Sequence, residues 1–132
     1  MGQADAPSIG GIPQEATVMF AQLVEEPLLP VDELRKQVVN YQQAVQHAVQ
    51  AGHTVDADMG IRIANACLKL LDRVSPGMPE RQQRLVQAAV RYFVLADDAE
   101  GDLTSWSGFE DDGAVLNAVL RHLDLERFCV PV

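Results

Sequence analysis

Residues 92–115 read YFVLADDAEGDLTSWSGFEDDGAV, a stretch in which an apolar helix end meets an acidic segment and a second helix begins. The stretch contains seven carboxylates and no Lys or Arg between the first and the last of them: Asp97, Asp98, Glu100, Asp102, Glu110, Asp111 and Asp112. The formal charge of the chain is −9, so removing these seven leaves only −2 for all other residues. The negative charge is therefore local, and this stretch is the first place to search for a site.

On both sides of this stretch, apolar residues recur every three or four positions, which is typical of amphipathic helices. We expect a short helix over 15–25, long helices over 32–51, from 56 or 58 to about 74 and from 79 to the apolar end above, and a last helix from about 111. No segment shows the period of two that marks a strand. The predicted fold is all-α: a single-domain bundle of four main helices plus a short N-terminal helix, with an acidic loop over 97–112 between the last two helices.

The length of 132 residues suits one hydrophobic core. Residues 1–14 mix Gly, Pro and polar residues without periodicity, which predicts a flexible N-terminal segment. The rest, 15–132, is predicted to be a single helical domain. Aromatic residues make up only 5% of the chain, so the core has to be built mainly from Ala, Val, Leu and Ile.

The acidic composition of the chain makes some classes of binding partner less favourable than others. A sequence pI near 4.6 disfavours nucleic acids, which are bound by clustered Lys and Arg, and disfavours anionic membrane surfaces for the same reason. No apolar run approaches the roughly 20 residues of a membrane span. Cys67 and Cys129 are far apart and do not form a C-x-x-C pair, so nothing requires an oxidising compartment. We expect a cytoplasmic protein that meets other proteins, metal ions or cationic ligands.

The stretch 92–115 resembles the core signature of the YkvA-like family of small, helical, mostly bacterial proteins of unknown function. That signature is a Tyr-Phe helix end, two spaced aspartates, a glycine and an Asp-Asp pair that opens the next helix. The matching residues in this chain are Tyr92, Phe93, Asp98, Asp102, Gly108, Asp111 and Asp112. The resemblance covers about 25 of the 132 residues. It implies a helical fold more than an activity.

The chain also departs from the family pattern. Ala96 and Gly101 stand where the family has prolines, and Asp97, Ala99 and Glu100 replace residues that are usually apolar. These changes predict a more flexible and more acidic loop.

One hypothesis for the aspartates is a divalent-metal site that binds Ca²⁺, Mg²⁺ or Mn²⁺. Hard cations take several oxygen ligands, and Asp98 and Asp102 are four residues apart, so they face the same way if a helical turn continues between them. Asp111 and Asp112 would close the site across the loop. The pattern is not an EF-hand, because Leu103 stands where that loop needs Gly, and its closing Glu is replaced by a phenylalanine.

The alternative is that the aspartates are structural. Asp111 would cap the last helix, Asp112 would favour the positive end of its dipole, and Asp98 and Asp102 would bind backbone N–H groups of the loop. Catalysis has less support, because the chain has no H-E-x-x-H pair, no cysteine at zinc spacing and no G-x-S-x-G motif.

The leading hypothesis is therefore a small cytoplasmic helical protein without catalytic activity or cofactor, acting by contact with an unidentified protein or by self-association. The second hypothesis is a metal-binding domain, serving a hydrolase, that uses Asp98, Asp102, Asp111 and Asp112 of the 97–112 segment.

Overall fold

The computed structural model describes residues 10–50, 57–100 and 108–130 of the chain. The helices in these ranges are η2 (Gln14–Ala16), α1 (Thr17–Val24), α2 (Val31–Gln50), α3 (Ala57–Asp72), α4 (Glu80–Glu100), α5 (Gly108–His122) and η4 (Glu126–Phe128). The described ranges contain no strand. The prediction of an all-α bundle of four long helices and a short N-terminal helix is confirmed.

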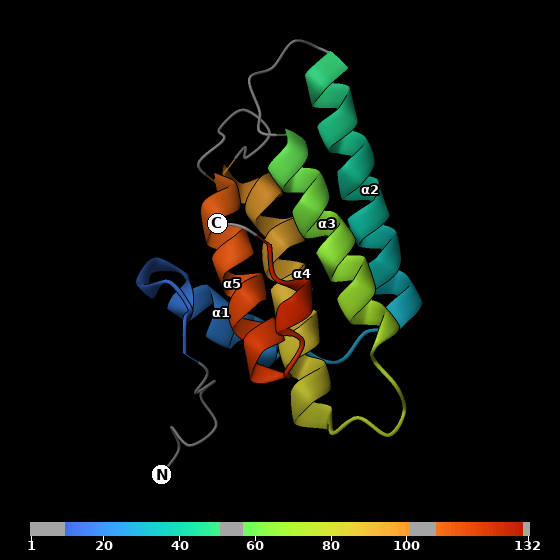
Figure 1. Ribbon diagram of the computed structural model, residues 1–132, viewed down its shortest axis with the longest axis vertical. Helices are drawn as coiled ribbons and strands as arrows, with labels where there is room; N and C mark the ends of the chain where they lie inside the picture. Colours follow the sequence, from blue (N-terminus) through green and yellow to red (C-terminus); the bar gives the residue numbers. More distant parts are fainter. Residues whose placement is uncertain (1–9, 51–56, 101–107, 131–132) are drawn as a thin grey trace.

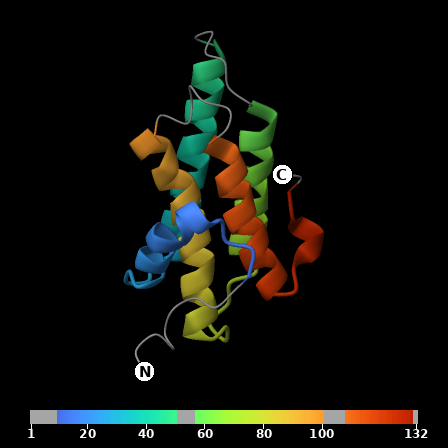
Figure 2. The ribbon, with the colours of Figure 1, turned by 90° about the vertical axis from the view of Figure 1, so that its left-hand side faces the viewer.

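The four long helices pack as two neighbouring pairs, α2 with α3 and α4 with α5, and α3 also contacts both α4 and α5. Figures 1 and 2 show the short helix α1 lying across the long helices, where it packs on α4. After α5 the chain turns back, and η4 lies against both α5 and α3. Residues 126–130, which we call the C-terminal segment, are therefore part of the bundle surface beside α3.

The core forms along the apolar faces that the sequence periodicity predicts. On α2 the buried positions recur every three or four residues, at Leu34, Val38, Tyr41 and Val45. On α4 six consecutive residues, 85–90, are buried, and α5 has the same feature at 115–120. Continuous burial means that neighbours cover α4 and α5 on several sides, so these are the two central helices of the bundle.

The connection between α1 and α2 is fixed to α4 by side chains of α4. Gln87, which is 1% exposed, accepts a hydrogen bond from the Leu29 N–H at 2.7 Å and donates one to the Pro27 carbonyl at 2.8 Å. The Arg84 guanidinium donates to the carbonyls of Val24 and Glu26 at 3.1 and 2.9 Å. These bonds satisfy backbone groups that a turn without secondary structure leaves unpaired.

The boundaries of the acidic segment differ from the prediction. Helix α4 continues to Glu100 and α5 begins at Gly108, so a loop over 97–112 is too long. Helix α4 continues because Ala96, a strong helix former, stands where a proline would break the helix. Asp111 lies inside α5 and is not its N-cap.

At the N-terminus, the first nine residues lie outside the described part, so the flexibility expected of 1–14 stays a prediction. Ile12 packs against the core, and Gly11 has φ +92°, a backbone conformation that favours glycine. A Cβ at Gly11 would meet the Ala118 side chain at 3.4 Å. None of the described helices is long and apolar enough to cross a membrane.

The packing of α2 against α4 predicts the effect of a core truncation. Phe93 is fully buried, and its ring centroid lies 4.3 Å from that of Tyr41. We expect Phe93→Ala to lower the free energy of unfolding by about 3–5 kcal/mol, measured by urea denaturation. The matched control is Val18→Ala, at a position that is 70% exposed, where we expect less than about 0.5 kcal/mol. Equal losses in the two variants would contradict this packing.

Candidate functional site

The four aspartates of the metal hypothesis are only partly described. Asp98 lies in the last turn of α4, Asp111 and Asp112 lie in α5, and Asp102 is outside the described residues. The side chains of Asp98 and Asp111 are also outside the described part. Among the side chains that the structure does describe, no group of three or more His, Cys, Asp or Glu residues is placed to hold a metal ion. The metal site therefore stays a prediction.

Asp112 is part of the interior at the start of α5, with 1% of its surface exposed. Burial raises the pKa of the Cys67 thiol on α3, and the negative charge of Asp112 raises it further. A thiol with a raised pKa stays protonated and does not act as a nucleophile. Cys67 is therefore a small core residue, as its place on the apolar face of α3 predicts.

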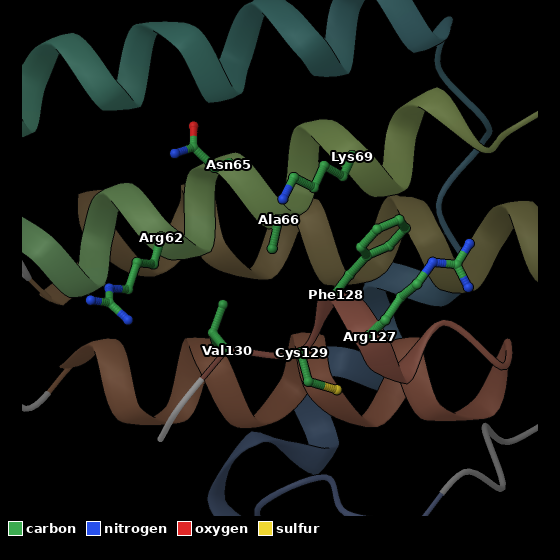
Figure 3. A pocket seen from close by; sticks show the side chains of 8 residues that line it. All are labelled: Arg62, Asn65, Ala66, Lys69, Arg127, Phe128, Cys129 and Val130. Atoms are coloured by element: carbon green, nitrogen blue, oxygen red, sulfur yellow. The ribbon is translucent and has the colours of Figure 1, made fainter.

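A surface hollow of about 250 Å³ lies between α3 and the C-terminal segment (Figure 3). We call it the basic pocket. It is lined by Arg62, Asn65, Ala66 and Lys69 from α3 and by Arg127, Phe128, Cys129 and Val130 from the C-terminal segment.

The positive charges of the pocket come partly from one face of α3. Arg62, Lys69 and Arg73 are separated by seven and four residues, so their side chains leave the helix on the same side. At 1.5 Å per residue, Arg62 and Lys69 are about 10 Å apart along the helix axis. Ala66 lies between them and forms an apolar floor. The result is a stripe with cations at its ends and the nearly buried Ala66 between them.

The ring of Phe128 contacts two cations of this stripe, Lys69 and Arg73, and brings a further one, Arg127, beside them. Its ring lies 5.7 Å from the Lys69 ammonium, 5.4 Å from the Arg73 guanidinium and 4.8 Å from the Arg127 guanidinium. Each distance is within the range of a cation–π contact, in which the ring face attracts a positive charge. Phe128 thus holds three positive groups close together, although their mutual repulsion opposes this.

None of these cations has a carboxylate partner among the described residues. The three ion pairs found there are Arg35 with Asp72, Arg84 with Glu80 and Arg91 with Glu26. Arg62, Lys69, Arg73 and Arg127 take part in none of them. Three positive side chains that line the hollow, and Arg73 on the Phe128 ring beside it, are therefore without a carboxylate partner among the described residues.

The wall formed by the C-terminal segment depends on Asn117 of α5. Its carboxamide donates to the Val130 carbonyl and accepts from the Val130 N–H, each at 2.8 Å. Asn117 is 2% exposed and Val130 is 8% exposed, so both bonds are shielded from water. This pair of bonds fixes residues 126–130 next to α3 and so places Phe128 and Arg127 at the pocket.

The described residues that line the pocket offer cations, a carboxamide, an aromatic ring and small apolar groups. Among them there is no carboxylate and no histidine to act as a base. Burial raises the pKa of the Cys129 thiol, which lies near the Asn117 carbonyl of α5 with the sulfur 3.9 Å from that oxygen. His47 and His122 are exposed on α2 and α5, and neither is among the described residues that line the pocket. His53, Ser105 and Ser107 are outside the described residues.

The basic pocket was not among the sites expected from the sequence. The spacing of Arg62, Lys69 and Arg73 on one helix face was visible in the sequence, but three cations on a surface helix are most often only solvated. The second half of the site, Arg127 and Phe128, lies more than 50 residues later, and only the fold brings the two halves together.

Comparison with known proteins adds no relative. No protein-family model matches the sequence, and neither the curated proteins nor the solved structures include a match. The resemblance to the YkvA-like family therefore stays a prediction based on residues 92–115.

The bonds of Asn117 predict the effect of removing its side chain. We expect Asn117→Ala to release residues 126–130, because the Val130 N–H and carbonyl lose both partners. Amide hydrogen exchange at Val130 should become at least tenfold faster, while exchange in the centre of α4 changes by a smaller factor. The control is Asn65→Ala, which removes the same side chain at an exposed position of α3. Unchanged exchange at Val130 would show that Asn117 does not hold the segment.

Proposed function

We propose that this chain is a small, non-catalytic, cytoplasmic helical protein that acts by protein contact, and that its basic pocket binds an acidic segment of a partner protein. The observation that carries the proposal is the group of three cations that line one hollow, with Arg73 beside them on the Phe128 ring, all without described carboxylate partners. The absence of a base or a reactive nucleophile from the lining is consistent with binding alone.

The energetics favour a ligand that combines charge with apolar surface. An ion pair on an open protein surface contributes little, because water solvates both charges. In the basic pocket the cations stand beside Ala66, Phe128 and Val130, and a ligand side chain that covers these groups displaces water from the ion pairs. The same charges then attract more strongly, because the local dielectric constant falls.

A peptide suits this site better than a nucleic acid or an anionic membrane. Both of those are extended polyanions, and the net charge of −9 repels them over the whole molecular surface. The cationic face spans about 16 Å of α3, from Arg62 to Arg73, at 1.5 Å per residue. A short acidic segment matches this small area and avoids most of the repulsion.

Binding of an acidic peptide tests the proposal. We expect an octaglutamate peptide to shift the backbone amide NMR signals of residues 62–73 and 126–130, with an affinity that falls as salt is added. The double variant Arg62→Glu, Lys69→Glu should weaken binding about tenfold or more, because each change replaces an attraction by a repulsion. Arg81→Glu is the matched control, since Arg81 is exposed on α4 and lies outside the pocket, and we expect less than a twofold change.

Three results would count against a peptide-binding pocket. The first is the absence of any shift with octaglutamate at low salt. The second is equal weakening by Arg81→Glu, which would show that only net charge matters. The third is tighter binding of a single-stranded oligonucleotide of eight phosphates at the same residues, which would assign the pocket to nucleic acid.

The metal-binding alternative keeps one observation in its favour. Helices α4 and α5 are antiparallel neighbours, so the end of α4 and the start of α5 lie at the same end of the bundle (Figure 1). The backbone thus brings the helix turns that carry Asp98 and Asp111 to one region. Oxygen ligands from two helix ends suit Ca²⁺, Mg²⁺ or Mn²⁺, and such a site would be compatible with a hydrolase.

Thermal unfolding of the metal-stripped protein tests this alternative. A cation at 100 times its dissociation constant stabilises the folded state by about 2.7 kcal/mol, which raises the Tm by several degrees. We expect Asp98→Asn to abolish the rise in Tm. The control is Glu25→Gln, which removes one negative charge at an exposed position directly after α1 and should preserve the rise. No rise with millimolar Ca²⁺, Mg²⁺ or Mn²⁺ would exclude the metal site.

A further inference from the structure

The basic pocket consists of two halves, and only one of them belongs to a long helix. Four of the eight lining residues lie on α3, and the other four lie on the C-terminal segment (Figure 3). We infer that the C-terminal segment acts as a strap: the pocket binds an acidic peptide only while this segment is docked on α3, and a bound peptide in turn holds the segment in place. This inference rests on the proposed function and adds how the pocket is regulated.

Few contacts hold the C-terminal segment on the helices. Among the described residues, every hydrogen bond that joins this segment to a helix involves Asn117, which pairs with the Val130 N–H and carbonyl at 2.8 Å and accepts from the Cys129 thiol at 3.9 Å. The turn η4 contains no buried residue, and Val130 is the one residue of the segment that is buried. A segment with so few shielded bonds opens at a lower free energy than the long helices do.

The backbone at the start of the turn opposes docking. Asp124 has φ +62°, a left-handed conformation that favours glycine and is strained for a residue with a side chain. It lies where α5 has ended and the chain reverses, and the next N–H, that of Leu125, donates to the Leu120 carbonyl at 2.7 Å. Release of the C-terminal segment would allow Asp124 to return to an ordinary φ. Asp124 is therefore the hinge of the strap.

Docking also brings like charges together. The Arg127 guanidinium lies 4.8 Å from the centre of the Phe128 ring, and two cations of α3, Lys69 and Arg73, lie 5.7 and 5.4 Å from the same point. Attraction to the ring favours this arrangement, whereas repulsion among the three charges opposes it. A carboxylate bound beside Lys69 and Arg127 reduces the repulsion, because it neutralises part of the positive charge.

Binding and docking are therefore linked. When the C-terminal segment leaves α3, the pocket loses half of its lining, including Arg127 and the Phe128 ring. An acidic peptide then binds the open state more weakly than the docked state. A ligand shifts an equilibrium toward the state that it binds more tightly, and this coupling is reciprocal.

Hydrogen exchange of the unmodified chain tests the coupling without any variant. The Val130 N–H donates to Asn117, so its exchange reports opening of the strap. We expect octaglutamate at ten times its dissociation constant to slow this exchange about tenfold at constant ionic strength. The neutral peptide octaserine is the control and should leave the exchange rate unchanged.

A variant outside the pocket tests whether binding needs the docked strap. Asn117 does not line the pocket, yet we expect Asn117→Ala to bind octaglutamate at least fivefold more weakly, because a smaller fraction of the chain is then competent to bind. The matched control is Gln87→Ala, which removes the other buried amide and its two bonds to the α1–α2 connection. We expect Gln87→Ala to change the affinity less than twofold.

The hinge is tested by two variants with the same charge. Asp124→Gly removes the side chain that is strained at this φ, whereas Asp124→Asn removes the same negative charge and keeps a side chain. We expect the Val130 N–H to exchange about fivefold more slowly in Asp124→Gly than in Asp124→Asn. This pair remains decisive if the circular dichroism spectrum shows that Asn117→Ala does not fold.

The outcomes separate the strap from the proposed function. An affinity for octaglutamate that is unchanged in folded Asn117→Ala would overturn the strap and leave the acidic-peptide pocket in place. Val130 exchange that saturating octaglutamate does not slow, or that is equal in the two Asp124 variants, would do the same. Absence of octaglutamate binding to the original chain would overturn both.

Discussion

The structure depends on one constraint: its two central helices bury polar amides that have to be paired with the backbone of a crossing segment. Helices α4 and α5 are each buried over six consecutive residues, and each includes one amide side chain there, Gln87 and Asn117. A buried amide without partners costs free energy, whereas a paired one is nearly neutral. Gln87 pairs with Pro27 and Leu29, and Asn117 pairs with Val130.

The two pairings hold two chain segments against the central helices α4 and α5. Each crossing segment lacks regular secondary structure at the contact, so its own N–H and carbonyl groups need partners. Each amide supplies one donor and one acceptor, so it pairs with one N–H and one carbonyl of the crossing backbone. If that backbone shifted by a residue, both hydrogen bonds would be lost. Gln87 thereby fixes the connection that carries the chain from α1 to α2, and Asn117 fixes the segment that carries Phe128 to α3. The basic pocket is a consequence of the second pairing.

The helices were predictable from the sequence because they follow from local signals. Apolar periodicity gave α2, α3 and α5 close to their observed ranges, and Pro79 directly precedes the first residue of α4. The acidic residues after Leu95 predict a loop, yet α4 continues to Glu100, because Ala96, Ala99 and Glu100 are good helix formers and no proline interrupts them. Asp111 matches the preference for aspartate at an N-cap, but α5 begins three residues earlier, at Gly108.

The site could not be predicted in the same way, because it combines residues from distant parts of the chain. Only the α3 half, Arg62, Lys69 and Arg73, has a sequence signal. The other half requires that the chain turn back after α5 and that Asn117 hold Val130, and neither fact is contained in a local pattern. The acidic stretch drew attention in the sequence because its charges are consecutive, while the basic residues are separated by 7, 4 and 54 positions.

The opposite signs of the acidic stretch and the basic pocket have a consequence for selectivity. At physiological salt the Debye length is about 8 Å, so the net charge of −9 acts on an approaching ligand mainly within that distance of the surface. A long polyanion meets repulsion along most of its length, whereas a short acidic segment reaches the three cations that line the pocket with little repulsion. The excess negative charge is therefore compatible with a basic site. It disfavours long anionic ligands and leaves short ones as the ligands that such a site can bind. A locally positive pocket on a strongly negative protein is better suited to a short peptide motif than the same pocket on a neutral protein would be.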